Sequence, residues 1–512
     1  MFIKTVFLGA FTFCFFSVLS LGATLFVPDD YATIQDAIDQ ANAGDTIVVK
    51  EGVYLENINF RGKGITVESE KKPPDESVID GGRQGSVVTF NSGEGLDSVL
   101  KGFLITNGSG TAGNDPQGGG IYCESSSPTI TENIISFNEA MGINMTYGGG
   151  IAFIDSSAMV VNNIISSNFT KRGGGISIGN SDLLLENNII AFNHLDQTCN
   201  DTIGGGIHIS GSNRTTTIRN CLIVNNTSYN GGGGVCCSGE QSSTMVVNCT
   251  ISNNSGGSRG GGLFVFYGLN VNVTNSIICG NTASSGTQIQ VGYYYPQYPP
   301  SSLSIDYSCV PGGQSGVFVD TGSTLIWGAS VITDSPLFVN GPGHYLDKTY
   351  NNYYLSQVDA GQSQTSACVD AGTGLLLDPA CTTRTDHYPD EPDIDVGYHF
   401  PQAVPASFYL SVEPEPLVAG QSANFCVSGG KKYSYTCLFY SRWGYGSKYV
   451  NFFDININLD RPRLVGNVEM TDAYGMAFWK VKVPLEASKL TALYFQAVQY
   501  GTCSNLLEVV VD

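Results

Sequence analysis

Apolar residues recur through the middle of the chain in short groups bounded by asparagine and glycine. Seven heptapeptides share an apolar fourth residue and a final asparagine: KGFLITN (101–107), ENIISFN (132–138), NNIISSN (162–168), NNIIAFN (187–193), NCLIVNN (220–226), NCTISNN (248–254) and NSIICGN (275–281). The fourth residue is Leu104 in the first heptapeptide and isoleucine in the others, so one aliphatic side chain per repeat is expected to be buried. The irregular spacing of the final asparagines favours a coil of short strands over helical repeats of fixed length.

A second series of glycines keeps the same period. Glycine clusters end at Gly120, Gly150, Gly175, Gly206, Gly234 and Gly262, and an apolar residue follows each of them. Each period therefore contains a glycine corner, a strand, a variable turn, a second strand and an asparagine corner. Such short strands cannot bury a face alone, but a coil stacks them in parallel around one interior. The pattern predicts an all-β fold, a right-handed parallel β-helix (a single-stranded solenoid).

Stacking predicts ladders of equivalent residues about 4.8 Å apart. We expect the isoleucines to form an interior column and the final asparagines to pass side-chain hydrogen bonds from rung to rung. Asparagine also tolerates the left-handed backbone of a sharp corner. Cys221 and Cys249 share one heptapeptide position, which predicts either a disulfide or a stack of two thiols, and the stack is the favoured interpretation.

The N-terminal end of the repeat predicts a cap. In DDYATIQDAIDQANAGDTIVV, Ile34, Ala37, Ile38 and Ala41 lie on one face of a short helix that Gly44 would end. This capping helix would cover the open edge of the first strands.

The C-terminal residues follow a different sequence pattern. The segment PQAVPAS (401–407) predicts a linker after a β-helix of residues 24–400. From residue 408 to 512 apolar and polar residues alternate, as in ANFCVSG and AFWKVKV, which predicts an antiparallel β-sandwich.

Residues 1–23 form a long apolar stretch with a lysine near its start and small residues at Ser20, Gly22 and Ala23. This pattern predicts a cleaved signal peptide, and the alternative is an uncleaved membrane anchor, because the stretch approaches spanning length. No later segment is long and apolar enough to span a bilayer. We therefore expect a secreted or cell-surface protein with no membrane span in the mature chain.

The number of cysteines is consistent with a protein in an oxidising compartment. Removal of Cys14 with the signal peptide would leave an odd number, so at least one thiol stays unpaired within a monomer. Cys368 and Cys381 flank a short loop and are predicted to form a disulfide.

The amino-acid composition excludes some classes of binding partner. The net charge of -21 disfavours nucleic acid and anionic membrane surfaces, because both need clustered lysine and arginine. The acidic balance fits extracellular solubility and cation binding, with calcium as the candidate cofactor. No oligomeric state follows from the pattern.

The segment TIQDAIDQANAGDTIVVKEGVYLENI, followed by GITVES, SVIDGG and FLITNGSG, resembles the opening of the pectate-lyase-like right-handed β-helix proteins of bacterial surfaces. The later segments DSPLFVN, SACVDAGTG, TTRTD and DIDVGYHF look like the closing rungs of proteins in this group. The resemblance covers about residues 25–400. It implies the fold strongly and polysaccharide cleavage only weakly.

The residues themselves do not assemble an obvious catalytic set. A lyase needs a base beside a neutralising cation, and a glycosidase needs paired carboxylates. After each glycine corner one residue is expected to point outward: Tyr122, Ala152, Ser177, His208, Cys236 and Phe264. His208 is the single base in this line. Arg172 and Arg259 precede glycine corners and are expected to lie too far apart to act together.

Two other clusters could bind a ligand. Tyr293, Tyr294, Tyr295 and Tyr298 interrupt the repeat in VGYYYPQYPP and suit stacking against sugar rings, although this run could equally cover a side of the coil. The densest acidic cluster lies in TDHYPDEPDIDVG: Asp386, Asp390, Asp393 and Asp395. It supplies the oxygen ligands that Ca²⁺ prefers, although an acidic turn at the end of a coil has the same composition.

These features predict a secreted, non-catalytic surface protein whose β-helix binds polysaccharide or cell-surface glycan. One alternative is a polysaccharide lyase or another carbohydrate-active enzyme of the pectate-lyase-like class. A second alternative is a rigid spacer anchored through its C-terminal module.

Overall fold

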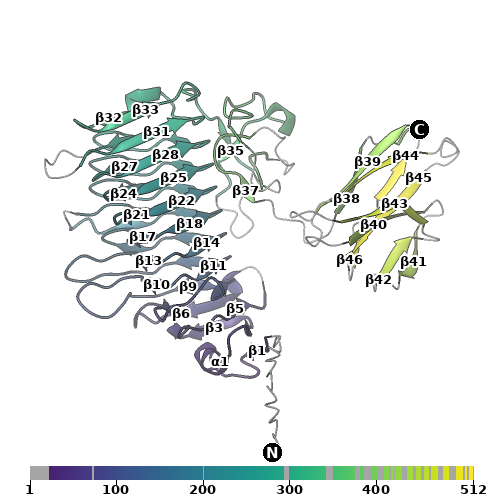
Figure 1. Cartoon of the computed structure of the whole chain (residues 1–512), viewed down its shortest axis with the longest axis horizontal. Coiled ribbons are helices and arrows are strands. Elements are labelled where there is room, and N and C mark those ends of the chain that lie inside the picture. Colours follow the sequence, from purple (N-terminus) through teal and green to yellow (C-terminus); the bar gives the residue numbers. More distant parts are fainter. Residues whose placement is uncertain are drawn as a thin grey trace, which may run out of the picture. The chain divides into compact units, whose positions relative to one another are not determined.

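The computed structural model describes residues 22–71, 74–199, 201–292, 299–341, 350–374, 381–385 and 394–401 and, in the C-terminal part, residues 409–413, 417–419, 421–428, 435–441, 445–450, 455–459, 463–470, 477–483, 492–499, 502–503 and 507–510. The chain divides into two compact units, Met1–Leu184 and Leu185–Asp512. In both units short strands wind as rungs of a right-handed parallel β-solenoid, as the repeat predicts (Figure 1).

The strands of each turn belong to three parallel sheets, which we call A, B and C. In the first unit, sheet A contains β1 (Thr24–Val27), β2 (Thr46–Val49), β5 (Thr66–Ser69), β8 (Val99–Lys101), β11 (Thr129–Thr131) and β14 (Met159–Val161). Sheet B contains β3 (Gly52–Leu55), β6 (Ser77–Asp80), β9 (Leu104–Thr106), β12 (Ile134–Ser136) and β15 (Ile164–Ser166). Sheet C contains β4 (Ile58–Asn59), β7 (Val88–Phe90), β10 (Ile121–Glu124), β13 (Ile151–Ile154) and β17 (Ile176–Gly179). The shorter elements are η1 (Pro74–Glu76) and β16 (Phe169–Thr170), and β18 (Leu183–Glu186) contains the division between the units.

The second unit repeats this arrangement. Its sheet A contains β22 (Thr215–Arg219), β25 (Ser243–Val247), β28 (Asn270–Thr274), β31 (Ser302–Asp306) and β33 (Thr324–Trp327). Its sheet B contains β19 (Ile189–Ala191), β23 (Leu222–Val224), β26 (Thr250–Ser252) and β29 (Ile277–Cys279). Its sheet C contains β21 (Ile207–Ser210), β24 (Val235–Ser238), β27 (Leu263–Phe266), β30 (Ile289–Val291) and β32 (Val317–Val319). The shorter elements are β20 (His194–Leu195) and η2 (Gly313–Gly316).

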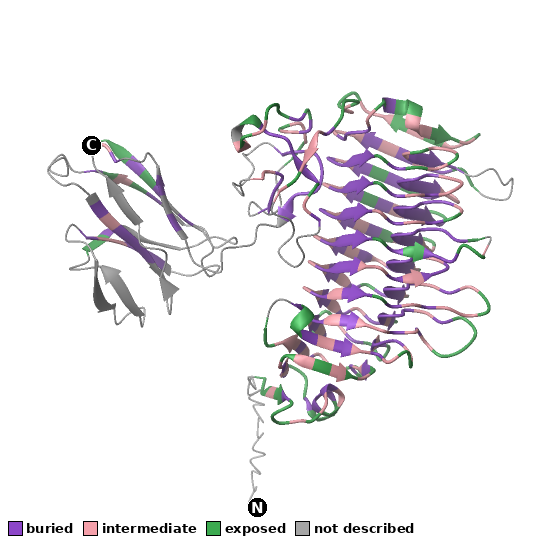
Figure 2. Ribbon diagram, turned by 180° about the vertical axis from the view of Figure 1, so that it is seen from behind, coloured by how far each residue is buried: buried purple, intermediate pink, exposed green. Residues whose placement is uncertain are grey.

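The predicted isoleucine column fills the interior. Ile135 pairs with Ile165 in the first unit, and Ile223, Ile251 and Ile278 pair in succession in the second. All five side chains are fully buried, and Figure 2 shows buried residues in the strands of successive rungs. Burial of this continuous column supplies the apolar stabilisation that no single strand could provide.

The first heptapeptide lies one residue away from its predicted register. Ile105, and not Leu104, pairs with Ile135. The reason is a corner: Gly102 (φ 83°) takes the left-handed position that Glu132 (φ 58°) occupies one turn later. The prediction that Leu104 is the interior residue was therefore wrong.

The final asparagines form the predicted ladder. The Asn226 Oδ1 accepts the backbone N–H of Asn193 at 3.0 Å and its side-chain N–H at 2.9 Å. The Asn226 Nδ2 donates to the carbonyl oxygen of Ile190 at 2.8 Å and to Asn254 Oδ1 at 3.0 Å. Equivalent bonds join Asn254 to Asn281 and, in the first unit, Asn138 to Asn168. Because these amides are buried, each bond satisfies a group that would otherwise be costly.

Left-handed corners use a different set of asparagines. The first heptapeptide position has φ between 46° and 59° in five repeats: Asn162, Asn187, Asn220, Asn248 and Asn275. The residue before each ladder position is also left-handed, as at Phe137 (φ 58°) and Asn225 (φ 57°). Asn107 (φ 56°) is a corner residue of this second kind, so Gly108 takes its expected place and donates its N–H to Asn138 Oδ1 at 2.9 Å.

The glycine corner and the asparagine ladder form one packing unit. A Cβ added to Gly120 would lie 3.0 Å from Asn138 Nδ2, and one added to Gly234 would lie 3.0 Å from Asn254 Nδ2. A side chain at the last glycine of the cluster would therefore press on the buried amide.

A second column of hydrogen bonds, which the repeat did not reveal, runs through the second heptapeptide position. In the first unit the N–H of Asn133 donates to Asn163 Oδ1 at 2.9 Å. In the second unit the N–H of Cys221 donates to Cys249 Sγ at 3.4 Å, and the N–H of Cys249 donates to Ser276 Oγ at 3.1 Å. Asparagine, cysteine and serine thus serve as equivalent acceptors. Cys221 and Cys249 are thiols, so the favoured stack is confirmed.

Helix α1 (Ile34–Gln40) contacts β1, β2 and β4 at the N-terminal end of the coil. Its apolar face buries Ile34, Ala37 and Ile38, as predicted. The helix ends at Gln40, four residues before the predicted Gly44, which instead has φ 90° in the turn before β2.

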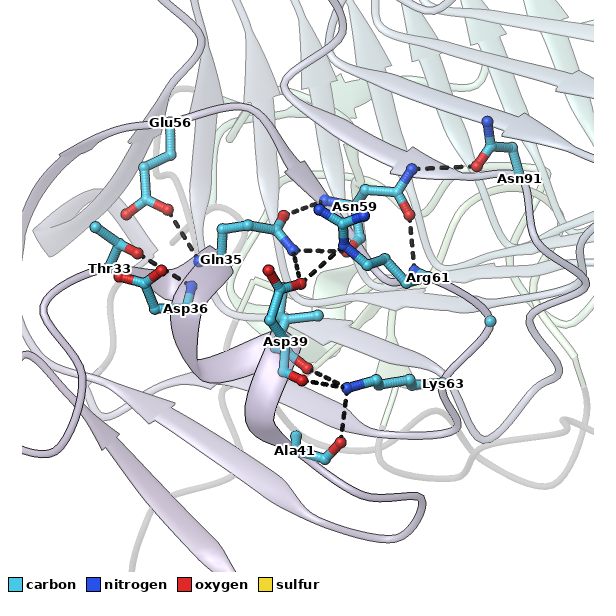
Figure 3. Close-up of polar contacts among 12 residues, drawn as sticks. Thr33, Gln35, Asp36, Asp39, Ala41, Glu56, Asn59, Arg61, Lys63 and Asn91 are labelled. Atoms are coloured by element: carbon cyan, nitrogen blue, oxygen red, sulfur yellow. Dashed lines mark hydrogen bonds and ion pairs between the residues drawn. The ribbon is translucent and has the colours of Figure 1, made fainter.

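Two side chains from outside the helix satisfy its ends (Figure 3). The Glu56 carboxylate accepts the N–H groups of Ile34 and Gln35, each at 3.0 Å. The Lys63 Nζ donates to three carbonyl oxygens at the C-terminal end, those of Ile38 (2.7 Å), Asp39 (2.9 Å) and Ala41 (2.8 Å). Both charges complement the helix dipole.

Residues 350–374, 381–385 and 394–401 form a segment that we call the strap. It contains β35 (Tyr354–Leu355), η3 (Val358–Ala360), β36 (Cys381–Thr382) and β37 (Phe400–Pro401), and β34 (Phe338–Val339) pairs with β35. Figure 1 shows β35 and β37 beside the stacked rungs.

Outward side chains at the corner of sheet B hold the backbone of the strap. The Asn220 Nδ2 donates to the carbonyl oxygen of His399 at 2.8 Å, and its Oδ1 accepts the N–H of His399 at 2.7 Å. Asn275 makes the same pair of bonds with Thr373, both at 2.9 Å. The strap therefore docks through paired amide hydrogen bonds two rungs apart.

The strap segments do not add the closing rungs that the resemblance implied. The Thr250 Oγ1 accepts the N–H of Tyr398 at 3.0 Å, which places this segment across sheet B and not above its last strand. Tyr354 stacks on Phe400 with 3.8 Å between ring centroids. The aromatic and apolar side chains of the strap are buried by lying over the coil.

The C-terminal part is an antiparallel β-sandwich, as predicted. One sheet contains β38 (Tyr409–Glu413), β39 (Ser422–Ser428) and β44 (Ala477–Lys482). The other contains β40 (Tyr435–Ser441), β43 (Arg463–Met470), β45 (Ala492–Gln499), β46 (Thr502–Cys503) and β47 (Leu507–Val510). A further pair is β41 (Tyr445–Val450) with β42 (Ile455–Leu459). Phe425 and Trp479 of the first sheet share one core with Leu438 and Phe495 of the second.

The ladder predicts a large effect from a small substitution. Asn138→Ala would leave the N–H of Gly108 and the carbonyl oxygen of Ile105 without their buried partner, at a cost of about 3 kcal/mol or more. The measurement is the midpoint of chemical denaturation. Phe137→Gly is the matched control, since its left-handed backbone suits glycine; it is expected to change stability by no more than about 1 kcal/mol. Equal effects of the two substitutions would contradict the ladder's role.

The strap predicts sensitivity to acid. Burial lowers the pKa of His399 to about 4, although nearby Asp395 favours protonation. In the unfolded chain the ordinary pKa is about 6.5, so protons bind preferentially to the unfolded state between these values. The contribution of His399 to stability is expected to be constant above about pH 6.5 and to fall by about 1.4 kcal/mol per pH unit between about pH 6.5 and pH 4. Denaturation midpoints at several pH values would measure this, and His399→Gln should reduce the slope; an unchanged slope would exclude His399 as its source.

Candidate functional site

The outer face of sheet C is covered by the chain's own loops. The third glycine from the end of a cluster lies over the residue four positions later: an added Cβ at Gly204 would be 2.8 Å from the Cβ of His208, and one at Gly232 would be 2.7 Å from the Cβ of Cys236. Phe264 packs with Ile203 and Cys236 in a buried cluster.

The outward line of residues is consequently not a binding surface along its length. His208 is only 1% exposed, and Ala152, Ser177, Cys236 and Phe264 are also buried. Alternation did place these side chains on the outer side of the strand. It could not show that the glycine loops fold back over them.

The outer face of sheet B is covered in the second unit. Its outward residues are buried in pairs on successive strands: Ile189 and Ala191, Leu222 and Val224, Thr250 and Ser252, Ile277 and Cys279. The hydrogen bonds to Asn220, Thr250 and Asn275 identify the strap as the cover.

The outer face of sheet A remains open. In the second unit it carries two parallel columns across five strands, one of Thr215, Ser243, Asn270, Ser302 and Thr324 and one of Thr217, Met245, Asn272, Ser304 and Ile326. Every one of these residues is exposed or half-buried. We call these two columns the polar face. It presents hydroxyl and amide groups at rung intervals of about 4.8 Å on a flat sheet.

Charged groups lie along one edge of the polar face. Arg219 Nη2 lies 2.6 Å from Glu186 Oε1. In the same column as Arg219, Asp306 accepts the N–H groups of Tyr307 (2.9 Å) and Ser330 (3.1 Å) through Oδ1. These charges are engaged with neighbouring groups, so hydroxyls and amides dominate the chemistry of the face.

Sequence reasoning missed the polar face, although its signal is present. Polar and apolar residues alternate in NVNVT (270–274) and SLSID (302–306), and the pattern is less regular in TTTIR (215–219) and STMVV (243–247), where Thr216 and Thr244 are the buried residues. Alternation with a period of two residues is typical of a strand with one buried and one solvent-exposed face. Hydroxyl and amide groups do not titrate, so this face carries none of the acid, base or metal-ligand patterns that a catalytic site would show in the sequence.

The four tyrosines predicted to stack on sugars, Tyr293, Tyr294, Tyr295 and Tyr298, lie outside the described residues. The described residues on either side locate the ends of their segment. The N–H of Gly292 donates to the carbonyl oxygen of Val265 at 2.7 Å, and Pro299 lies against Gly268. The segment therefore connects β30 to β31, a strand of the polar face.

The predicted calcium cluster is described only in part. Asp386, Asp390 and Asp393 lie outside the described residues. Asp395 is buried, and its carboxylate accepts hydrogen bonds inside the strap from the Asp370 N–H (2.8 Å), Gln357 Nε2 (3.1 Å) and Thr383 Oγ1. Within the described ranges no group of three His, Cys, Asp or Glu side chains could hold a metal ion. Calcium binding stays a prediction.

Cys368 and Cys381, which are predicted to form a disulfide, are both free thiols in this structure. Cys368 is a free thiol in the apolar cluster that contains Cys309. The Cys381 Sγ lies 4.0 Å from Asn220 Nδ2 instead. The two cysteines are close in sequence, but they dock at different places on the coil.

The two arginines beside glycine corners have local partners. Arg172 lies over the ring of Tyr147, 5.9 Å from its centroid, in the first unit. Arg259 Nη1 donates to the carbonyl oxygen of Asn230 at 3.5 Å in the second. Neither contact by itself indicates that the arginine removes a proton from a substrate.

Residues 41–229 match a protein-family model described as a right handed beta helix region. The chain gives no match among curated proteins. Among the helices of the described residues, none has the length and apolar character needed to cross a bilayer.

Several solved structures are similar to the chain at low identity. One is pectate lyase Pel9A, at 12% identity, covering 74% of this chain and 96% of that one, with a TM-score of 0.32. Another is the PL6 family alginate lyase AlyGC, at 14% identity, covering 78% and 60%, with a TM-score of 0.31. A third is the enzymatically active domain of bacteriophage CBA120 tailspike protein 4, at 13% identity, covering 91% and 64%, with a TM-score of 0.30. Likeness at this level carries nothing about substrate or reaction.

Proposed function

We propose that the protein is secreted or displayed at a cell surface and binds glycan through the polar face without cleaving it. The observation that carries this proposal is selective exposure. In the second unit, loops cover the outer face of sheet C and the strap covers that of sheet B, whereas the polar face stays open.

The chemistry of the polar face suits a sugar chain. Serine, threonine and asparagine side chains can both donate and accept hydrogen bonds, as sugar hydroxyls do. Met245 (39% exposed) and Ile326 (57% exposed) add apolar area in the same column as Asn272. A flat sheet with repeated groups suits an extended polymer, because each rung can repeat a contact made by the previous one. The tyrosine segment that precedes β31 in the chain is proposed to add aromatic stacking.

A glycan array followed by calorimetry on a retained glycan tests the proposal. Asn272→Ala should weaken binding by about three- to tenfold, the value of one lost hydrogen bond. Asn114→Ala, on an exposed loop of the first unit, is the matched control and should bind like the parent protein. Retention of no glycan, or equal weakening by both substitutions, would exclude this face as the site.

A polysaccharide lyase is the second candidate. At the edge of the polar face the half-buried side chain of Arg219 lies beside that of Glu186, and a lyase uses a base close to a cationic group. We expect no cleavage, because this pair is engaged in its own ion pair. Incubation with uronate and neutral polysaccharides, with and without Ca²⁺, measures the outcome. Cleavage would appear as new ultraviolet absorption from unsaturated ends or as new reducing ends. If either signal appeared and was lost in Arg219→Met, the protein would be an enzyme and the non-catalytic proposal would be wrong.

The spacer alternative has its own test. Deletion of residues 405–512 would release a protein anchored through its C-terminal module from the cell surface. Release together with a glycan array that retains nothing would support a spacer over a binding protein.

A further inference from the structure

Three cysteines meet where the strap crosses the last rungs of sheet B. Cys279 and Cys309 belong to the coil and Cys368 belongs to the strap, and all three lie in one buried apolar cluster with Ile277 and Val396. Cys309 and Cys368 are fully buried, and the proximity of the Cys368 thiol raises the pKa of Cys309.

Backbone hydrogen bonds within the coil hold Cys309 in place. The N–H of Cys309 donates to the carbonyl oxygen of Ser276 at 2.8 Å, and the N–H of Ile278 donates to that of Cys309 at 2.9 Å. Cys309 therefore continues the outward column of sheet B that contains Ile277, with which it forms a parallel bridge.

The strap fixes the second thiol. The N–H of Cys368 donates to Ser366 Oγ at 3.1 Å, and the N–H of Val396 donates to the carbonyl oxygen of Cys368 at 2.8 Å. Asn275 binds the strap at Thr373 in the rung that precedes Cys309, and Asn220 binds it at His399 two rungs earlier. These bonds hold the strap close to Cys309.

We propose that Cys309 and Cys368 form a disulfide that fastens the strap to the coil. The oxidant is a small disulfide such as oxidised glutathione. One cysteine thiolate attacks it and releases one glutathione thiol, and the second cysteine thiolate then displaces the other glutathione from the mixed disulfide. The two cysteines lose two protons and two electrons, and two molecules of reduced glutathione are formed.

The other candidate partners fit less well. The Cys279 Sγ shares a hydrogen bond of 3.5 Å with Ser252 Oγ, and the Cys309 Sγ donates to the carbonyl oxygen of Asp334 at 3.3 Å, so these bonds alone do not distinguish the two thiols. Cys381 lies against Asn220, the anchor of His399, and not in the cluster that contains Cys368. Cys309 is favoured over Cys279 because it is fully buried, as Cys368 is, and because the Cys368 thiol is the neighbour that most affects it.

Burial of the thiols also determines the stage of folding at which the disulfide can form. The neighbouring Cys368 thiol and burial together raise the pKa of Cys309 far above its usual range, so the reactive thiolate is scarce in the docked protein. Oxidation is therefore expected before the strap docks or while it is open. Once formed, the disulfide is shielded from reductants in solution.

Peptide mapping of the full-length protein tests the pairing. The protein is unfolded, refolded with or without oxidised glutathione, alkylated without reduction and digested. Mass spectrometry should find a peptide with Cys309 joined to Cys368 only after oxidation. Alkylation of both cysteines after refolding with glutathione, or a link from Cys368 to Cys279 or Cys381, would overturn the proposal.

Hydrogen exchange tests the consequence for the strap. Amides of residues 394–401 should exchange at least about tenfold more slowly in the oxidised protein, because a disulfide opposes opening of the segment. Cys368→Ser should abolish the difference. Cys221→Ser, in the interior column where Ser276 is already tolerated, should retain it. Equal exchange in oxidised and reduced parent protein would exclude a fastening role, and neither experiment depends on glycan binding.

Discussion

Hydrogen bonds between equivalent side chains of successive rungs are the constraint on which this coil depends. The buried amide of Asn226 joins Asn193 on one side to Asn254 on the other, so each rung fixes the height and register of the next. Strands of only a few residues could otherwise slip, and a slip of one residue would move the interior isoleucines to the outer face. The ladder also demands glycine at the facing corner, because a side chain there would displace the amide.

The same close packing decides which surfaces remain available. Glycine clusters allow the loops to fold onto the outer side of sheet C, which buries His208 and Phe264. Asparagines at the left-handed corner of sheet B have side chains that point outward, and Asn220 and Asn275 use them to bind the strap. What one polar residue type does therefore depends on its position within the corner: inside it stacks the rungs, and outside it docks another segment.

The strap is organised by buried polar groups as much as by apolar ones. Asp395 gathers the N–H of Asp370 and the side chains of Gln357 and Thr383, and so ties three strap segments to each other. An isolated buried carboxylate would be costly, but one that accepts several hydrogen bonds can hold irregular backbone in a single conformation. This explains how a segment with few strands of its own covers a sheet face.

The sequence by itself determined the coil, its isoleucine and asparagine ladders, the helix at its N-terminal end and the sandwich at its C-terminal end. These features are periodic or local, and periodicity survives in a one-dimensional pattern. The shifted register at Leu104 was missed because a glycine replaced the usual corner residue. Only the tertiary structure decided which faces are covered and which cysteines meet. Both depend on segments distant in sequence, and the contact of Cys368 with Cys309 instead of Cys381 follows from where the strap crosses the rungs. No local spacing encodes that crossing, because it is fixed by Asn220 and Asn275 binding the backbone of residues more than a hundred and about a hundred positions away.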